Sequence, residues 1–433
     1  AAARRQDGAA LLITLVLIGL LAVAAGVWIV SSTAAASQRL QDTARAMGMI
    51  RDALIARAAS DRNRPGSLPC PDVDNDGLSL GPGPEWTGSA CTSYIGRVPW
   101  QTLDLPDLRD ADGERFWYAL APAFRDSSAG GPLSSDTPGS LTVAGTPPAT
   151  DVVAIIIAPG APLPGQTRDP ANTTISSELP QYLEGDNSNA DSTYQAGPES
   201  DTFNDRLLVI TRDMLMPPVE QRVARQTRRC LENFAASAGG RYPFAARMSD
   251  MGTYPDGVFI SPGVYNTTNN YYGRIPSTLD ATNAALGGTS YAWPIDDPLP
   301  GSGSTRCFQS GTWWDSWREL LLYRIAPAYL PSAATPGPCG TCLQVNGQGD
   351  VKFVVIVAGR ALSSPSQTSR STVKTVAQYY LEQYQSFDNA VAFTSPFAAF
   401  SFGKAPRAVR TGPLGGFNDR VECVREAGAP PCD

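Results

Sequence analysis

The feature that most constrains this chain is an uncharged apolar run close to its beginning. No charged side chain occurs between Asp7 and Arg39, and residues 9–30 are mainly Leu, Ala, Val and Ile. As an α-helix, about 20 such residues span the ~30 Å hydrocarbon core of a bilayer. Arg4 and Arg5 precede the run, and a long polar remainder follows it. The positive-inside tendency therefore predicts a cytoplasmic basic end and an exported remainder.

The helical pattern continues beyond the apolar run. No proline occurs before Pro65, and apolar residues recur at steps of three and four, at Leu40, Ala44, Met47, Ile50, Leu54 and Ala58. This pattern predicts one continuous helix over residues 9–62, apolar on all sides at first and amphipathic afterwards. A cleaved secretory signal would be followed by a break in the helix, and a plain membrane anchor rarely needs such a rigid extension.

This start resembles that of the type IV pilins and pseudopilins. Residues 4–8 (RRQDG) match the class III leader of that family, and residues 9–12 (AALL) match the start of its mature chain. The resemblance implies cleavage between Gly8 and Ala9 by a prepilin peptidase, methylation of the new N-terminus, and packing of the apolar helix into a filament core. The implied filament-core residues are Leu11, Leu12, Ile13, Leu15, Leu17, Leu20, Val23 and Val27.

Two further phrases, LPCPD (68–72) and GRVPW (96–100), resemble a bacterial group of large pilin-like proteins with the same start. One departure concerns the fifth mature position, where the family usually has Glu and this chain has Ile13. Family members without that Glu are often minor subunits that start or cap a filament. The resemblance therefore leaves two alternatives open, a major filament subunit and a minor or tip pseudopilin of a type IV pilus or type II secretion system.

Composition fits an exported, loop-rich protein and excludes some functions. The 433 residues include 40 Gly and 37 Pro, only 17 % are charged, and the net charge is −7. An acidic balance without a basic cluster argues against nucleic-acid binding. The chain contains no His, which excludes Ser-His-Asp and Cys-His catalysis. Carboxylate pairs remain available, but no spacing singles one out, so we predict no catalytic residue and no enzyme activity.

The eight cysteines of an exported chain predict up to four disulfides. Cys339 and Cys342 form a C-x-x-C motif within PGPCGTCLQ, which favours a structural bridge over redox or zinc chemistry. Spacing alone does not fix the remaining connectivity. The other candidate pairs are Cys70 with Cys91, Cys230 with Cys307, and Cys423 with Cys432.

One segment resembles a cation-binding loop. Asp72, Asp74 and Asp76, followed by a glycine, have the D-x-D-x-D-G pattern in which alternate carboxylates converge on calcium. The distal glutamate of such loops is missing, because the twelfth position is Gly83 and Glu85 lies two residues further on. A turn satisfied by its own side-chain hydrogen bonds is the alternative. Calcium is the only cofactor that the sequence suggests.

The second half of the chain repeats the first, since six phrases recur in the same order. They are the amphipathic helical segment (again at 223–238), GRVP and GRIP (96–99, 273–276), WYALAPAF and LYRIAPAY (117–124, 322–329), a β-branched strand (152–158, 353–358), QYLE and QYYLE (181–184, 378–382), and FNDR twice (203–206, 417–420). Six matches in order indicate an internal duplication.

The predicted fold class is therefore α+β. A long N-terminal helix, apolar in its first half, precedes two duplicated pilin-like head units, each a helix on an antiparallel sheet with long loops. The predicted segments are 1–8 (leader), 9–62 (helix, with 9–30 as membrane or filament core), 63–216 (first unit) and 217–433 (second unit). We place the junction at 214–218, where Pro217 and Pro218 would end the preceding strand.

We expect a structural subunit of an extracellular, type IV pilus-like filament. Its expected partners are copies of itself in a helical homopolymer or other pilins, the prepilin peptidase and assembly machinery, and the bacterial inner membrane before assembly. A membrane-tethered enzyme or sugar-binding ectodomain is a further hypothesis. The aromatic segment Gly311–Trp317 suggests it, although such side chains also fill thin cores.

Overall fold

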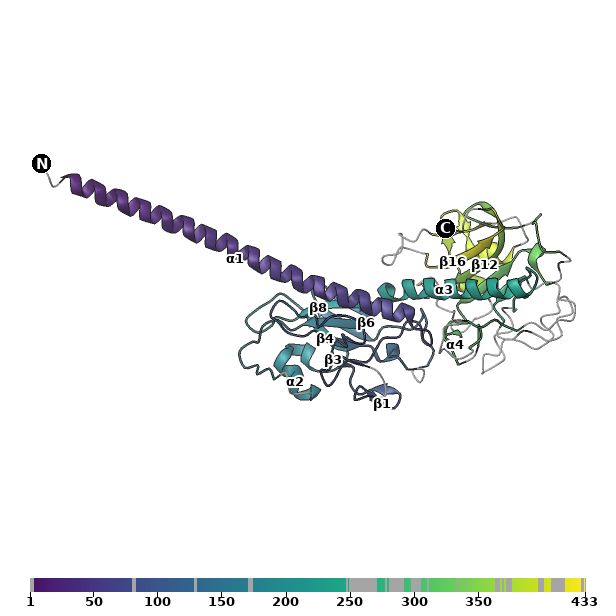
Figure 1. Cartoon of the computed structure of the whole chain (residues 1–433), viewed down its shortest axis with the longest axis horizontal. Coiled ribbons are helices and arrows are strands. Elements are labelled where there is room, and N and C mark those ends of the chain that lie inside the picture. Colours follow the sequence, from purple (N-terminus) through teal and green to yellow (C-terminus); the bar gives the residue numbers. More distant parts are fainter. Residues whose placement is uncertain are drawn as a thin grey trace.

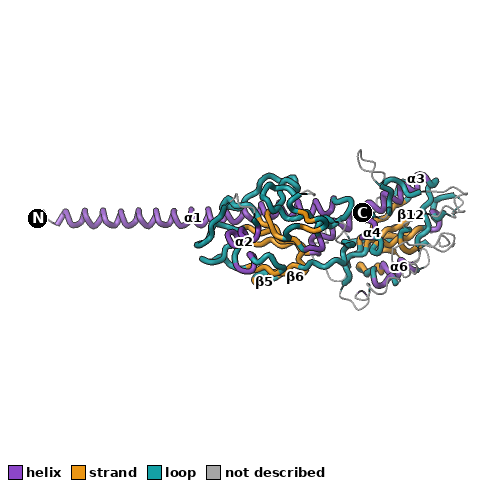
Figure 2. The backbone as a smooth tube through the Cα atoms, turned by 90° about the horizontal axis from the view of Figure 1, so that it is seen from below, coloured by secondary structure: helices purple, strands orange, loops and turns teal. Residues whose placement is uncertain are grey.

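The computed structural model describes residues 4–79, 83–127, 131–169, 174–246, 248, 271–276, 279, 292–296, 305–309, 311–331, 333, 335–340, 342–362, 367, 370, 376–395, 401–405, 417–429 and 432. A single long helix leads into two globular units that follow one another along the molecule (Figure 1). In both views the first half of this helix extends away from the globular part, and its second half lies along the first unit (Figure 2).

The long helix, α1, runs from Arg4 to Ser60. In its second half the apolar stripe faces the first unit, and Ile50, Leu54 and Ala58 are fully or almost fully buried there. The Asp61 carboxylate follows the last turn and accepts hydrogen bonds from the Asn63 N–H (2.9 Å) and the Arg64 N–H (2.7 Å), which turns the chain away from the helix axis. The amphipathic pattern thus correctly located the packed half of the helix.

The predicted fold class included a pilin-type helix with an apolar half of membrane length at 9–30. This part of the prediction is wrong. Among the residues that the structure describes, no helix is both long and apolar enough to cross a membrane. The apolar side chains described in this half occupy Leu12–Leu21. The side chains of Gly8, Ala9, Leu11, Val23 and Val27 lie outside the described set.

The first unit contains a six-stranded sheet centred on β6. Strand β8 pairs along one edge of β6, whereas β4 and β5 share its other edge; β3 extends the sheet beyond β4, and β7 extends it beyond β5. Helix α1 packs against β6 and β8. The strands are β3 (Ile95–Arg97), β4 (Trp117–Leu120), β5 (Leu141–Gly145), β6 (Ala149–Ala158), β7 (Thr193–Ala196) and β8 (Arg206–Thr211).

The second unit has the same arrangement, with β12 at its centre and β9, β10, β11, β15 and β16 in the places of β3, β4, β5, β7 and β8. Helix α3 packs on β12 and β16 as α1 packs on β6 and β8. The strands are β9 (Tyr272–Arg274), β10 (Leu321–Ile325), β11 (Leu343–Val345), β12 (Gln348–Val357), β15 (Ser401–Phe402) and β16 (Arg420–Arg425).

The equivalence of the units extends to single side chains. The Tyr118 hydroxyl donates to the Pro69 carbonyl at 3.3 Å, and the Tyr323 hydroxyl donates to the Pro243 carbonyl at the same distance. Both sheets are mixed, because β5 pairs with β7, and β11 with β15, in parallel. The other pairs of both sheets are antiparallel, and the one parallel pair of each unit lies where a long connection returns the chain in the same direction.

The smaller elements lie in the connections. They are β1 (Trp86–Thr87), β2 (Ala90–Cys91), α2 (Ile175–Tyr182), α4 (Trp314–Trp317), β13 (Gln383–Tyr384), β14 (Phe387–Asp388), α6 (Asn389–Thr394) and the 3₁₀ turns Pro122–Phe124, Gly185–Ser188, Pro327–Tyr329 and Ala377–Tyr379.

Helix α3 begins earlier than the sequence predicted. It runs from Arg212 to Ser237, directly after β8, and contains Pro217 and Pro218 in its second turn. The prediction that these prolines end the strand and precede the helix is wrong. Each proline removes one helical hydrogen bond. The helix nevertheless continues because its face is buried from Leu215 and Met216 onwards.

The two units are joined by side chains as well as by the chain itself. Arg360 of the second unit forms a bidentate ion pair with Asp213 at the start of α3 (2.6 and 3.1 Å). From the first unit, the Asp136 carboxylate accepts the Ala361 N–H (2.8 Å) and pairs with the Arg370 guanidinium (3.4 Å). These contacts fix the first-unit loop 131–137 on the second unit.

The packed half of α1 gives a test of the fold. Truncating the fully buried Leu54 to Ala removes core contacts and leaves a cavity, which should lower the free energy of unfolding by about 2–5 kcal/mol. Leu40→Ala is the matched control on the same helix, since Leu40 is 42 % exposed. Urea unfolding followed by circular dichroism measures both. Equal effects of the two substitutions would contradict the described packing.

Candidate functional site

The three aspartates of the predicted cation loop lie together. Oxygens of Asp72, Asp74 and Asp76 and a fourth carboxylate, that of Glu85, all lie within 4.8 Å of one another. Asp72 is buried and its carboxylate accepts the N–H groups of Asn75 (2.6 Å) and Gly77 (2.8 Å). Burial raises the pKa of Asp72 to about 6, although these two hydrogen bonds act in the opposite direction.

Glu85 is the member that sequence reasoning missed. It is 2 % exposed, burial raises the pKa of its carboxyl group, and its Oε1 has no hydrogen-bond partner among the described residues. It lies outside the twelve-residue spacing of a standard calcium loop. Glu85 directly precedes the β1–β2 hairpin, in which Trp86 pairs with Cys91, and a disulfide joins Cys91 to Cys70 near the aspartates. A glutamate just beyond the expected spacing was the available signal.

The acidic loop is held in shape from several directions. The Arg115 guanidinium donates to the Asn75 carbonyl (2.6 Å) and side-chain oxygen (2.8 Å). Gly77 has φ +86°, and a Cβ there would overlap the Trp100 indole. The Cys70–Cys91 disulfide closes the segment, with a Cα–Cα distance of 5.5 Å. A rigid loop loses little conformational freedom when it binds a ligand.

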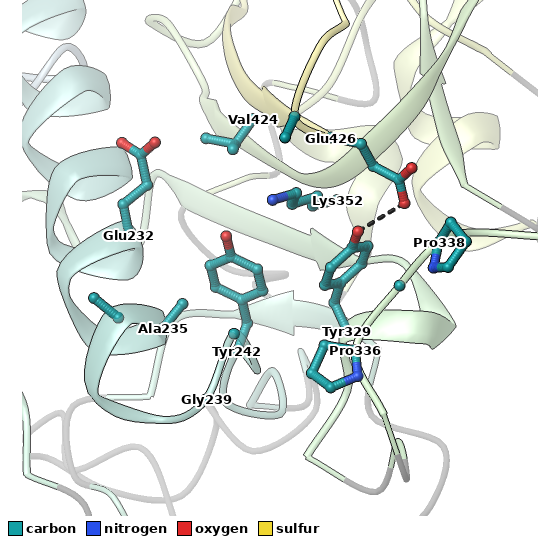
Figure 3. A pocket seen from close by; sticks show the side chains of 14 residues that line it. Glu232, Ala235, Gly239, Tyr242, Tyr329, Pro336, Pro338, Lys352, Val424 and Glu426 are labelled. Atoms are coloured by element: carbon teal, nitrogen blue, oxygen red, sulfur yellow. Dashed lines mark hydrogen bonds between the residues drawn. The ribbon is translucent and has the colours of Figure 1, made fainter.

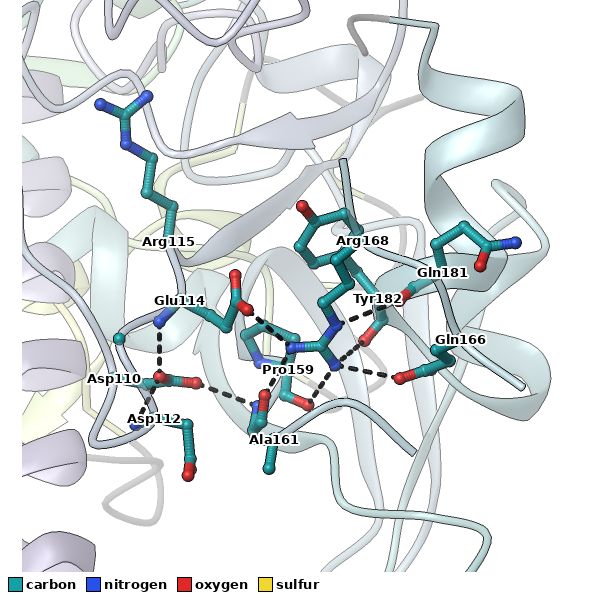
Figure 4. A network of polar contacts seen from close by, with 12 residues as sticks. Asp110, Asp112, Glu114, Arg115, Pro159, Ala161, Gln166, Arg168, Gln181 and Tyr182 are labelled. Atoms are coloured by element: carbon teal, nitrogen blue, oxygen red, sulfur yellow. Dashed lines mark hydrogen bonds and ion pairs between the residues drawn. The ribbon is translucent and has the colours of Figure 1, made fainter. Parts of the chain in front are cut away.

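A second group of polar residues is buried in the first unit beside β4 and β6 (Figure 4). The Arg168 guanidinium pairs with the Glu114 carboxylate (3.2 Å) and donates to the backbone carbonyls of Gly160 (2.6 Å) and Gln181 (3.1 Å). The Asp110 carboxylate accepts the N–H groups of Glu114 (2.9 Å) and Gly160 (3.0 Å). Burial raises the pKa of Asp110.

The group continues into a carboxyl pair. Glu184 accepts the N–H groups of Asn204 (3.0 Å) and Asp205 (3.2 Å), whereas the Asp205 carboxyl accepts the Glu184 N–H (2.9 Å) and the Asn187 side-chain amide (2.9 Å). Burial and the neighbouring Glu184 carboxylate raise the pKa of Asp205 to about 8. The FNDR and QYLE phrases of the sequence meet at this pair.

The second unit repeats this group. Asp419 accepts the Glu382 N–H (3.1 Å) and the Asn389 side-chain amide (2.8 Å), and Glu382 accepts the Asn418 N–H (2.9 Å). Burial raises the pKa of Asp419 well above its usual range. In both units the guanidinium of the arginine in the GR-V/I-P phrase lies over a tyrosine ring. Its central carbon is 4.0 Å from the ring centre for Arg97 and Tyr182, and 4.3 Å for Arg274 and Tyr380.

Perturbed, buried carboxyl groups often mark catalytic sites, but structural networks perturb pKa values as well. Here the carboxylates accept backbone N–H groups of the loops that cross the sheet edge, and the arrangement occurs twice. We therefore interpret these carboxylates as groups that hold the loops in place. They also explain why the GR-V/I-P, QYLE and FNDR phrases recur.

An open groove of about 880 Å³ lies at the far end of the second unit (Figure 3). The Tyr329 hydroxyl donates to the Glu426 carboxylate (2.7 Å), which lowers the pKa of Glu426, and the Lys352 ammonium lies 5.3 Å from the Tyr329 ring. Gly240 and Pro336 line this groove. Tyr329 therefore contacts both the Glu426 carboxylate and the Lys352 ammonium.

In the first unit the chain continues into α3 at the equivalent place. A Cβ at Gly66, the counterpart of Gly240, would lie 3.3 Å from Met216 of α3 and 3.4 Å from Leu133. The groove of the second unit is therefore the counterpart of the space that the first turns of α3 fill in the first unit.

The predicted disulfides are present. The structure joins Cys70 with Cys91, Cys230 with Cys307, Cys339 with Cys342, and Cys423 with Cys432. The C-x-x-C motif is therefore a bridge, and the Glu426 carboxylate beside it accepts the Cys339 N–H (2.8 Å). The aromatic segment is core: Trp313, Trp314 and Trp317 are buried, and Trp313 and Trp314 pack against Phe308. They offer no exposed sugar-binding platform.

The predicted filament-core residues that the structure describes are all exposed. Over Leu12–Leu21 the large apolar side chains are 53–69 % exposed, which leaves a continuous apolar surface around the projecting part of α1. Exposed apolar surface of this extent marks a protein–protein or membrane interaction site. The residues are Leu12, Ile13, Leu15, Val16, Leu17, Ile18, Leu20 and Leu21.

Comparison with protein-family models, curated proteins and solved structures finds no match to this chain.

The carboxyl pair predicts a pH-dependent stability. The pKa of the Asp205 carboxyl group is about 8 in the folded chain and about 3.9 in the unfolded chain. Between these two pH values the folded chain therefore keeps a proton that the unfolded chain has lost. Stability should therefore fall as pH rises from about 4 to about 8. Asp205→Asn, which cannot ionise, should reduce this fall.

Urea midpoints at pH 5 and pH 8 measure the effect, with Asp186→Asn on the neighbouring exposed turn as the matched control. The difference between wild type and Asp205→Asn isolates this carboxyl group from Asp419. An identical pH dependence of the two proteins would contradict the raised pKa.

Proposed function

We propose that this protein is a structural, non-enzymatic subunit of an extracellular, type IV pilus-like filament, and that copies assemble through the apolar segment Leu12–Leu21 of α1. The observation that carries the proposal is the exposure of that segment on a helix that projects from the globular units. The same helix is amphipathic and packed where it meets the first unit, so its apolar surface elsewhere is available for a partner.

A second copy of the chain would cover this apolar surface. Parallel packing of projecting helices would bury apolar area on all sides, at ~25 cal/mol per Å² removed from water. A heterologous contact of this kind, repeated without closure, generates a helical polymer. The two globular units would then surround the helices, and their disulfides suit an extracellular location.

Processing and location follow from the same proposal. The leader-like residues 4–8 would be removed by a prepilin peptidase, after a stage at the bacterial inner membrane and before export by the pilus assembly machinery. A minor or tip pseudopilin is the second candidate. Ile13 favours it, because this residue stands where the resembled family usually carries the glutamate that pairs with a neighbouring N-terminus.

Charge placed in the apolar segment should block assembly. Leu17→Glu introduces a carboxylate that assembled helices would have to bury without a partner, so filaments should be lost while the globular units stay folded. Met49→Glu is the control, since Met49 is 43 % exposed on the packed half of the same helix. Sedimentation and negative-stain electron microscopy measure assembly. Filaments formed equally well by Leu17→Glu would contradict the proposal.

The mass of the N-terminal peptide from protein recovered at the cell surface tests processing. We expect a chain that begins at Ala9, with a methyl group on its amine. A recovered chain that still carries Arg4 and Arg5 would rule out leader cleavage, and regular filaments in the same sample would separate a major subunit from a tip subunit.

A further inference from the structure

The acidic loop of the first unit combines two independent observations. The first is the convergence of four carboxylates, with oxygens of Asp72, Asp74, Asp76 and Glu85 all within 4.8 Å of one another. The second is that Glu85, at 2 % exposure, has an oxygen without a hydrogen-bond partner in the part of the chain that the structure describes. A buried, unpaired carboxylate oxygen is costly unless a cation binds it.

Among the described residues, the salt bridges do not neutralise this cluster. Arg115 contacts the loop, but it donates to Asn75 and pairs with Asp107 (3.0 Å). Within the described residues, no ion pair joins a Lys or Arg to any of the four carboxylates. Their mutual repulsion is therefore left for a bound cation to relieve.

The duplication supplies an internal comparison. The backbone of Asp72 pairs with that of Arg97 in an antiparallel bridge (3.0 and 2.8 Å). In the second unit the same bridge joins Ala246 to Arg274 (2.8 and 2.7 Å). The backbone bridge therefore forms with alanine at this position and needs no carboxylate. The carboxylate of Asp72 is an addition of the first unit rather than a requirement of the shared architecture.

We propose that this loop is a calcium site, with Asp72, Asp74, Asp76 and Glu85 as carboxylate ligands. The donor set consists of hard oxygens without nitrogen or sulfur, which suits Ca²⁺ or Mg²⁺ and not a transition metal. Calcium takes more protein ligands in flexible geometry, whereas magnesium usually keeps several waters. Four converging carboxylates in a closed loop favour calcium, and extracellular calcium levels would saturate a site of modest affinity.

The site has a structural consequence. It ties the turn after Cys70 to the β1–β2 hairpin through Glu85, on the segment that Cys70–Cys91 closes. Bound calcium would therefore stabilise the connection between α1 and the first sheet. This inference is independent of filament assembly, because the site lies in the globular unit and not on the projecting part of α1.

Terbium luminescence tests the site directly in the full chain, kept in solution with mild detergent. Tb³⁺ prefers the same oxygen ligands as Ca²⁺ and emits when a nearby tryptophan is excited; Trp100 packs on Gly77 of the loop. We expect sensitised emission that micromolar-to-millimolar Ca²⁺ displaces and equal Mg²⁺ does not. Wild type should also unfold at a higher temperature in Ca²⁺ than in EDTA.

Glu85→Gln should weaken Ca²⁺ binding about tenfold or more, because it removes one ligand charge without changing side-chain shape. Glu199→Gln on the exposed surface of the same unit is the matched control. Asp74→Asn is the second variant, since Asp74 is partly exposed and Asn retains its turn hydrogen bond to the Asp76 N–H. It should lose affinity while its unfolding temperature in EDTA matches wild type.

Absence of sensitised emission in wild type would overturn the proposal, as would equal affinity of wild type, Glu85→Gln and Asp74→Asn. Displacement by Mg²⁺ as readily as by Ca²⁺ would overturn the assignment to calcium. Loss of emission in both variants, with retention in Glu199→Gln, supports it.

Discussion

The structure depends on one arrangement, an amphipathic helix laid across a sheet whose central strand is buried on both faces. In β6 the residues from Val152 to Ile157 are fully buried, and in β12 those from Phe353 to Val357 are as well. Each fully buried aliphatic side chain contributes roughly 1.5–3 kcal/mol. A strand without a polar face needs cover on each side, and α1 and α3 provide it on one side of their sheets.

The polar groups of both units follow from this packing. Loops that cross the edge of a buried sheet carry backbone N–H groups away from water, and each must find an acceptor. Glu184 with Asp205, and Glu382 with Asp419, meet that need by accepting loop amides. Because removal of one partner would leave the others buried and unsatisfied, the pair is retained as a whole in each unit.

The units are related by continuity as well as by similarity. Strand β8 of the first unit runs directly into α3 of the second, so the helix that covers one sheet begins against the other unit, where Met216 packs near Gly66. In the second unit the counterpart of this space is the open groove beside Tyr329 and Glu426.

The sequence by itself determined the elements that depend on local pattern. Periodicity located the packed half of α1, β-branched runs located β6 and β12, and six ordered phrases revealed the duplication, since apolar spacing reports which face is buried. It misjudged Pro217 and Pro218, because burial of the α3 face outweighs a local rule, and it gave no sign that β5 and β7 pair in parallel. Only the tertiary structure decided that Glu85 meets the three aspartates, and that Arg97, Tyr182, Glu184 and Asp205 form one buried group. Arg97 and Tyr182, and Glu184 and Asp205, lie far apart in the chain, and they meet because loops close over a sheet, which no local spacing encodes.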